Sequence, residues 1–164
     1  MTMHAILGSV VVGVGATMVS DLWNLLLKRV LGIPSLNLCY LGRWLLHMPA
    51  GTFKHASIAA AAPKAHECVV GWVAHYTIGM VFALALVMVT SGEWLARPRL
   101  LPALLVGVVT LVFPFFVMQP ALGLGVASSR TPNPTLARLK SFMTHFSFGL
   151  GLYLCALAVS RLLP

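Results

Sequence analysis

The chain has 164 residues, of which 59% are hydrophobic and only 9% are charged. A soluble domain has about a quarter charged residues, because its surface faces water. The composition therefore excludes a soluble domain and indicates a protein of the lipid bilayer. The formal charge of +8 does not indicate a nucleic-acid partner, since the Lys and Arg residues separate apolar runs instead of forming a basic face.

Four apolar segments are long enough to cross a membrane, which takes about twenty helical residues. They are residues 4–27, 69–90, 100–122 and 139–160. We therefore predict an all-α, polytopic membrane four-helix bundle, built as a single transmembrane domain over residues 1–164. The first segment lacks the basic start of a signal peptide and is longer than its apolar core, so we expect it to be a retained helix.

The connector between the first two spans, residues 28–66, contains apolar residues at helical spacing around Trp44. This pattern predicts an interfacial helix over residues 35–48. At the start of the second span, Glu67 is expected to pair with a nearby base.

The cysteines are three in number and lack any CxxC spacing, which indicates neither a disulfide framework nor a zinc site. We expect Cys39, Cys68 and Cys155 to be reduced and to fill apolar space.

Basic residues are distributed unevenly between the two sides of the membrane. The loops after spans one and three hold eight Lys and Arg residues, whereas the opposite side holds three. The positive-inside rule then places these two loops in the cytoplasm and both termini outside. Three of the bases, Arg130, Arg138 and Lys140, are candidates for contact with an anion or a lipid headgroup.

Spans two and four share a six-residue pattern of His, aromatic, hydroxyl, apolar, Gly and apolar residues. It covers residues 75–80 and 145–150. We interpret it as a duplicated two-helix hairpin, with coincidence as the alternative, because apolar positions match easily between membrane helices. Two spans per copy make the repeats parallel, with His75 and His145 at the same depth.

Polar side chains gather in the half of the spans nearest the basic loops. The main candidates for proton or cation binding are Asp21, His75, Gln119 and His145, accompanied by Thr17, Asn24 and Tyr76. Ionisable groups within a membrane are costly and mark functional sites. The alternative is a packing role, since interhelical hydrogen bonds also hold bundles together.

Span three is interrupted by Pro114 and Pro120, and further Gly and Pro residues follow up to residue 134. Two readings are open. The segment could be a re-entrant or loop-lined vestibule, or a kinked helix followed by an ordinary loop.

Several motifs extend along nearly the whole chain. They are the segment from Gly15 to Trp23, Gly42-Arg43-Trp44, the segment from Glu67 to Tyr76, the segment from Pro114 to Gly123, Thr131-Pro132-Asn133-Pro134, and the segment from His145 to Tyr153. Together they resemble the DUF2938 family of small bacterial multi-pass membrane proteins. The resemblance implies a bacterial inner (cytoplasmic) membrane location and brings no activity with it.

Three functions fit these residues. The first is a small transporter or channel-like protein that binds protons or cations at the polar layer and assembles as a homo-oligomer, since four helices rarely enclose a pathway. The second is a protein that binds haem b through His75 and His145, with Gly79 and Gly149 leaving room for the porphyrin. The third is a non-catalytic scaffold subunit of a larger membrane complex. An enzyme is less favoured, because no catalytic triad, acid pair or zinc motif is present.

Overall fold

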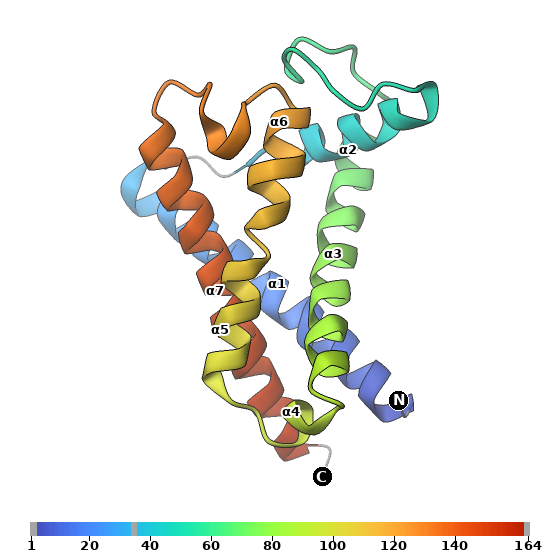
Figure 1. Cartoon of the computed structure of the whole chain (residues 1–164), viewed down its shortest axis with the longest axis vertical. Helices are drawn as coiled ribbons and strands as arrows, with labels where there is room; N and C mark the ends of the chain where they lie inside the picture. Colours follow the sequence, from blue (N-terminus) through green and yellow to red (C-terminus); the bar gives the residue numbers. More distant parts are fainter. Residues whose placement is uncertain (1–2, 34–35, 163–164) are drawn as a thin grey trace. The chain divides into compact units, whose positions relative to one another are not determined.

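The computed structural model describes residues 3–33 and 36–162. Its principal elements are helices (Figure 1): α1 (Met3–Leu31), α2 (Leu38–His47), α3 (Glu67–Val89), α4 (Glu93–Ala96), α5 (Leu100–Val109), α6 (Gln119–Ala121) and α7 (Pro134–Leu162). Three short helical turns complete them: η1 (Met48–Ala50), η2 (Pro114–Met118) and η3 (Val126–Ser128). These described residues contain no strand, so the all-α prediction is confirmed.

Among the described residues, four helices are long and apolar enough to cross a membrane: Met3–Leu31, Glu67–Val89, Leu100–Ala121 and Pro134–Arg161. The prediction of four candidate spans is confirmed. Large apolar side chains remain exposed along them; Leu22, Val73 and Val109 are each more than 60% exposed. Such exposure is unfavourable in water but suits contact with lipid tails.

A helix, α2, also forms within the segment expected to be interfacial, although residue 35 of that segment lies outside the described residues. The Asn37 side chain caps it by accepting a hydrogen bond of 3.0 Å from the Cys39 backbone N–H. In the same way the Asn133 side chain accepts a hydrogen bond of 3.1 Å from the Leu136 N–H at the start of α7. Pro134, the first residue of α7, has no N–H that needs a partner there.

Span three is a continuous helix with a π-helical turn, η2, which begins at Pro114. Proline has no N–H to donate, so the regular pattern of backbone bonds is interrupted there. The Gln119 N–H instead reaches the Pro114 carbonyl, five residues back. The helix is therefore irregular at Pro114, as the kinked-helix interpretation expects, and the vestibule interpretation of the following segment stays a prediction.

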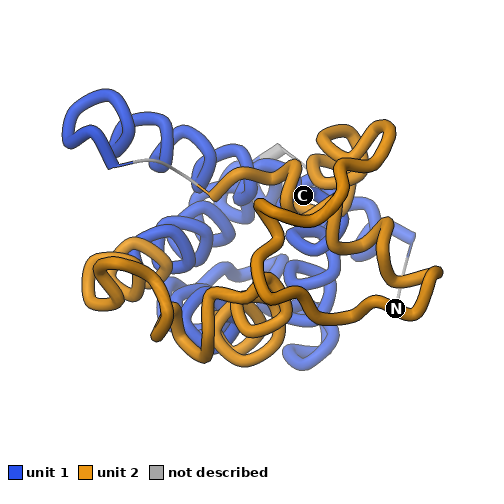
Figure 2. The backbone as a smooth tube through the Cα atoms, turned by 90° about the horizontal axis from the view of Figure 1, so that it is seen from above, with its two compact units in different colours: residues 1–35, 76–110, 143–164 blue, residues 36–75, 111–142 orange. Residues whose placement is uncertain are grey.

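The chain packs as two compact units (Figure 2). Unit 1 comprises residues 1–35, 76–110 and 143–164, and unit 2 comprises residues 36–75 and 111–142. The helices α3 and α7 each contribute residues to both. The expected single transmembrane domain stays a prediction.

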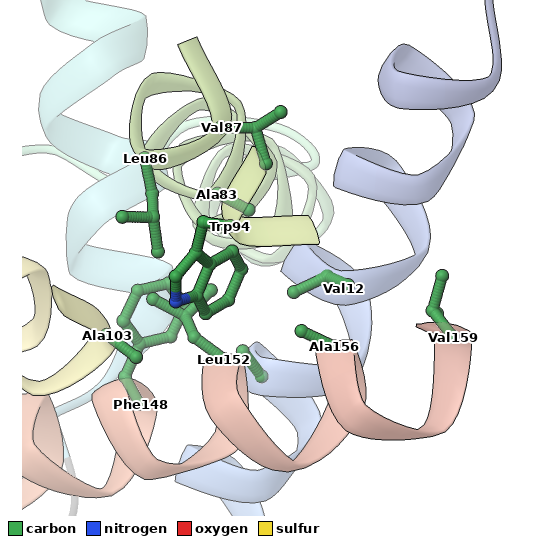
Figure 3. Close-up of a cluster of buried hydrophobic side chains, with 11 residues drawn as sticks. Val12, Ala83, Leu86, Val87, Trp94, Ala103, Phe148, Leu152, Ala156 and Val159 are labelled. Carbon is green, nitrogen blue, oxygen red and sulfur yellow. The ribbon is translucent and has the colours of Figure 1, made fainter. Parts of the chain in front are cut away.

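The core of unit 1 surrounds Trp94, which is 3% exposed and lies among Leu86, Phe148 and Leu152 (Figure 3). Its indole N–H donates to the Arg99 carbonyl at 2.9 Å, so the ring is buried without an unpaired polar atom. This bond also fixes the turn between α3 and α5.

Glycines allow the helices of unit 1 to approach closely. A Cβ on Gly13 would meet the Met80 backbone at 2.6 Å, and one on Gly107 would meet the Gly149 Cα at 2.9 Å. The two motif glycines Gly79 and Gly149 thus lie at crossings, the first between α1 and α3 and the second between α5 and α7. Small residues at such crossings are typical of membrane helices.

In unit 2, α2 crosses the start of α3 with the two backbones in contact. A Cβ on Gly42 would collide with the Glu67 carbonyl oxygen, and one on Gly71 with the Leu38 carbonyl oxygen. Only glycine fits at either position. This crossing positions the side chains on both sides of it, which include a disulfide and an ion pair.

Candidate functional site

The Asp21 carboxylate is the centre of the polar side chains in unit 1. Asp21 Oδ2 accepts a hydrogen bond of 3.1 Å from the Tyr76 hydroxyl, which links α1 to α3. Asp21 lies ten residues before the end of α1, a distance of about 15 Å along a helix that rises 1.5 Å per residue. The carboxylate therefore lies nearly three turns before the end of the helix.

Two more interhelical bonds extend this arrangement. The Thr144 hydroxyl donates to Asn24 Oδ1 at 2.8 Å, which joins α7 to α1. The His145 Nδ1 is 2.9 Å from the Thr110 hydroxyl at the end of α5, which joins α7 to α5. All four spans are thus connected through polar side chains. We define this set, Asp21, Asn24, Tyr76, Thr110, Thr144 and His145, as the polar network.

The other predicted residues, Thr17, His75 and Gln119, make different contacts. Thr17 is buried, bonds back to the Gly13 carbonyl of its own helix at 2.8 Å, and packs against Gly79. His75 and Gln119 belong to unit 2, where the His75 ring meets the Trp72 ring edge-on at 6.2 Å. Asp21 and His145 belong to unit 1 and the other two to unit 2, and the common layer stays a prediction.

Gln119 is 5% exposed, and its amide nitrogen is 3.4 Å from the Ser141 hydroxyl, a long hydrogen bond. Its amide oxygen is buried and has no hydrogen-bond partner among the described residues. The bond joins the end of span three to α7 within unit 2.

Arg43 and Glu67 form a buried ion pair across the α2–α3 crossing. Arg43 Nη2 lies 2.7 Å from Glu67 Oε1, and Arg43 Nε lies 2.8 Å from Glu67 Oε2, a two-pronged geometry. The hydrogen bonds that Arg43 donates to Glu67 raise the pKa of Arg43 above its ordinary value, so this guanidinium stays charged. The expectation that Glu67 pairs with a nearby base is confirmed.

The same guanidinium organises the connector. Arg43 Nη1 donates to the Ile58 carbonyl at 3.2 Å and the Ala61 carbonyl at 3.1 Å. The backbone N–H of Lys64 donates to Glu67 Oε2 at 2.9 Å. One ion pair thus holds the irregular segment between η1 and α3 in place. This role of the ion pair was not predicted from the sequence. Glu67, the one acidic residue at the end of a long basic connector, was the feature that indicated it.

Cys39 and Cys68 form a disulfide, so the prediction that all three cysteines are reduced is wrong for this pair. Cys155 is free, as expected. The disulfide forms because α2 crosses the start of α3 in close contact. Each paired cysteine stands three residues before a crossing glycine and therefore lies on the same helix face as that glycine. The matching Cys-x-x-Gly spacing in both segments was the missed signal.

Two histidines of the connector lie together, with His47 and His55 ring centroids 5.0 Å apart. Burial lowers the pKa of His55, and the neighbouring His47 ring lowers it further. His55 therefore favours its neutral form. No group of three or more His, Cys, Asp or Glu that could hold a metal ion occurs in residues 3–33 and 36–162.

The fold defines the class: an all-helical protein with four helices apolar enough to span a membrane. The sequence model of the family described as protein of unknown function (DUF2938) matches residues 10–159. The chain therefore belongs to the DUF2938 family. Searches of curated proteins and of solved structures found no match.

Proposed function

We propose that this protein is a small proton- or cation-binding membrane protein of the transporter or channel type, with Asp21 as its ionisable site. The observation that carries the proposal is the bond between the Asp21 carboxylate and the Tyr76 hydroxyl within two spans. Ionisable residues inside spans mark ion and proton pathways. Because four helices rarely enclose a pathway, the working form is a homo-oligomer in a bacterial inner membrane.

The neighbouring side chains support this role. His145 belongs to the same polar network and is the residue type that exchanges protons near neutral pH. Asn24 and Thr144 supply oxygens that suit a hard cation. The glycine crossings at Gly79 and Gly149 also support the proposed two-hairpin repeat, because the motif glycine serves the same purpose in both copies.

Infrared difference spectroscopy of the full chain in nanodiscs tests the site. The chain has only three acidic side chains, so its carboxyl signals are few. We expect acidification, or addition of a test cation, to change a carboxyl signal that is lost in Asp21→Asn and shifted in Tyr76→Phe. The control Glu93→Gln removes an exposed carboxylate and leaves that signal in place. An Asp21→Asn spectrum identical to the wild type would contradict the proposal.

A packing role for the polar network is the second candidate, as in the non-catalytic scaffold hypothesis. It is favoured by the three interhelical bonds, each of which would also stabilise a bundle without transport. The haem b hypothesis, in which His75 and His145 are the ligands, stays a prediction from the sequence.

Two indicators of membrane orientation disagree. The charge bias favours cytoplasmic loops after spans one and three, whereas the Cys39–Cys68 disulfide favours an oxidising compartment for the same side. We propose that the protein has the orientation indicated by the disulfide, with both termini in the cytoplasm. The charge rule is a statistical bias, whereas disulfides are rare on the reducing cytoplasmic side.

Thiol labelling in cells tests this orientation. Without reductant or prior alkylation, we expect Cys39 and Cys68 to resist a maleimide mass tag, and Cys39→Ser to make Cys68 reactive. A C-terminal fluorescent-protein fusion is expected to fluoresce, as it does in the cytoplasm. Labelling of both cysteines before reduction, together with an active periplasmic reporter at the C-terminus, would restore the orientation predicted from charge.

A further inference from the structure

The loops of unit 2 line an open hollow of about 210 Å³. Its lining residues are Lys54, Pro120, Gly125, Val126, Ser129 and Arg130. The space corresponds to about seven water molecules at roughly 30 Å³ each. Drug-sized ligands occupy pockets of about 300–1,000 Å³, so this hollow suits a small ligand or one end of a larger one.

Backbone bonds hold the walls of the hollow together. The connector and the end of span three are joined by the His55 N–H to the Ala121 carbonyl at 2.8 Å and by the Ile58 N–H to the Leu122 carbonyl at 3.0 Å. Arg138, one of the predicted anion contacts, donates from Nε to the Ala127 carbonyl at 2.9 Å. It therefore stabilises the loop that carries Ser129 and Arg130 and does not line the hollow.

Two cations from distant parts of the sequence, Lys54 and Arg130, line this small space. Both residues are exposed, and Ser129 lines the same hollow. Unit 2, all of whose residues are described, contains one acidic residue, Glu67, and that residue is paired with Arg43. The hollow is therefore lined by positive charge with no carboxylate among its lining residues.

Gly125 lets the backbone of the loop approach the Ser129 and Arg130 side chains closely. Its φ of +76° is in the left-handed region, and an added Cβ would collide with Ser129 Oγ and lie 2.9 Å from Arg130 Cγ. A side chain at this position would displace the two residues that carry the hydroxyl and the guanidinium. The loop sequence thus keeps Ser129 and Arg130 over the hollow.

We propose that this hollow binds a phosphate group. A guanidinium presents paired N–H donors to phosphate oxygens, an ammonium adds a second charge, and a serine hydroxyl donates one more hydrogen bond. The phosphate belongs either to an anionic lipid headgroup or to a soluble phosphate compound, since the chemistry recognised is the same. The site uses no residue of the polar network and goes beyond the proposed function.

Binding to the full chain in nanodiscs tests the site in two arms. In phosphatidylcholine nanodiscs, calorimetry measures the affinity for inorganic phosphate. In nanodiscs that also contain phosphatidylglycerol, native mass spectrometry counts the lipids retained by the protein. Arg130→Gln and Lys54→Gln each remove one cation from an exposed side chain, so the fold should persist. Lys64→Gln, in the same connector but away from the hollow, is the matched control.

We expect binding in at least one arm, weakened about tenfold or more by Arg130→Gln and by Lys54→Gln, because each loses a charge-assisted hydrogen bond. Lys64→Gln should leave it unchanged. Binding in the first arm identifies a soluble phosphate compound, and retention in the second alone identifies a headgroup. Absence of binding in both arms, or an equal loss in Lys64→Gln, would overturn the proposal.

Discussion

Replacing Arg43 with methionine is expected to lower the free energy of unfolding by clearly more than the loss of a single surface hydrogen bond does, because the Glu67 carboxylate loses its charged partner. Arg43 and Glu67 side chains are 10% and 13% exposed, so water cannot replace the lost bonds. The Ile58 and Ala61 carbonyls lose their donor at the same time. Chemical unfolding of the purified protein in mixed micelles measures the effect.

Two variants separate the ion pair from general damage. Arg43→Met with Glu67→Gln should cost less than the sum of the single changes, since the unpaired charge is gone. Arg138→Met, which loses a single bond to an exposed carbonyl, should cost about 1 kcal/mol. A loss for Arg43→Met no larger than that for Arg138→Met would show that the ion pair does not hold the connector.

Composition and segment length were sufficient to predict the spans, because a bilayer demands long apolar helices and leaves few alternatives. The helix ends were less predictable, since α7 begins at Pro134, five residues before the apolar run 139–160 that predicted span four. The kink at Pro114 was one of two readings that the sequence left open. The observed backbone adds a π-helical turn at this proline, which the sequence does not reveal.

Partners of the polar side chains could not be predicted, because helical periodicity gives the face of a residue on its own helix but not the helix that it meets. Asp21 and Tyr76 were both candidates, yet their bond depends on how α1 rotates against α3. Thr110 and Thr144 were overlooked as partners of His145 and Asn24 for the same reason. Pairing between distant helices is a tertiary property.

The unit 2 sites were predicted only in part, as single residues such as Glu67 and Arg130, because their partners depend on long-range contacts of irregular segments. Lys54 and Arg130 line one hollow only because the connector binds the end of span three through backbone bonds. The disulfide between Cys39 and Cys68 requires two glycines to meet at a helix crossing. Counting cysteines or bases along the sequence does not detect either arrangement.

Loss of transport in Asp21→Asn is the second large effect that we expect. The amide keeps the size and hydrogen-bonding ability of the side chain but can neither take up a proton nor neutralise a cation. Proton or cation flux should therefore fall to the level of protein-free liposomes. Thr144→Val is the matched control, since it removes an interhelical bond of the same network and no ionisable group.

Flux through proteoliposomes that contain the full chain is the most direct test of the proposed function. A dye inside the vesicles reports protons or the test cation after a membrane potential is imposed. The proposal predicts flux above background for the wild type and for Thr144→Val, and none for Asp21→Asn. Equal flux in the wild type and Asp21→Asn, or no flux in any of them, would contradict it and favour a packing role for the polar network.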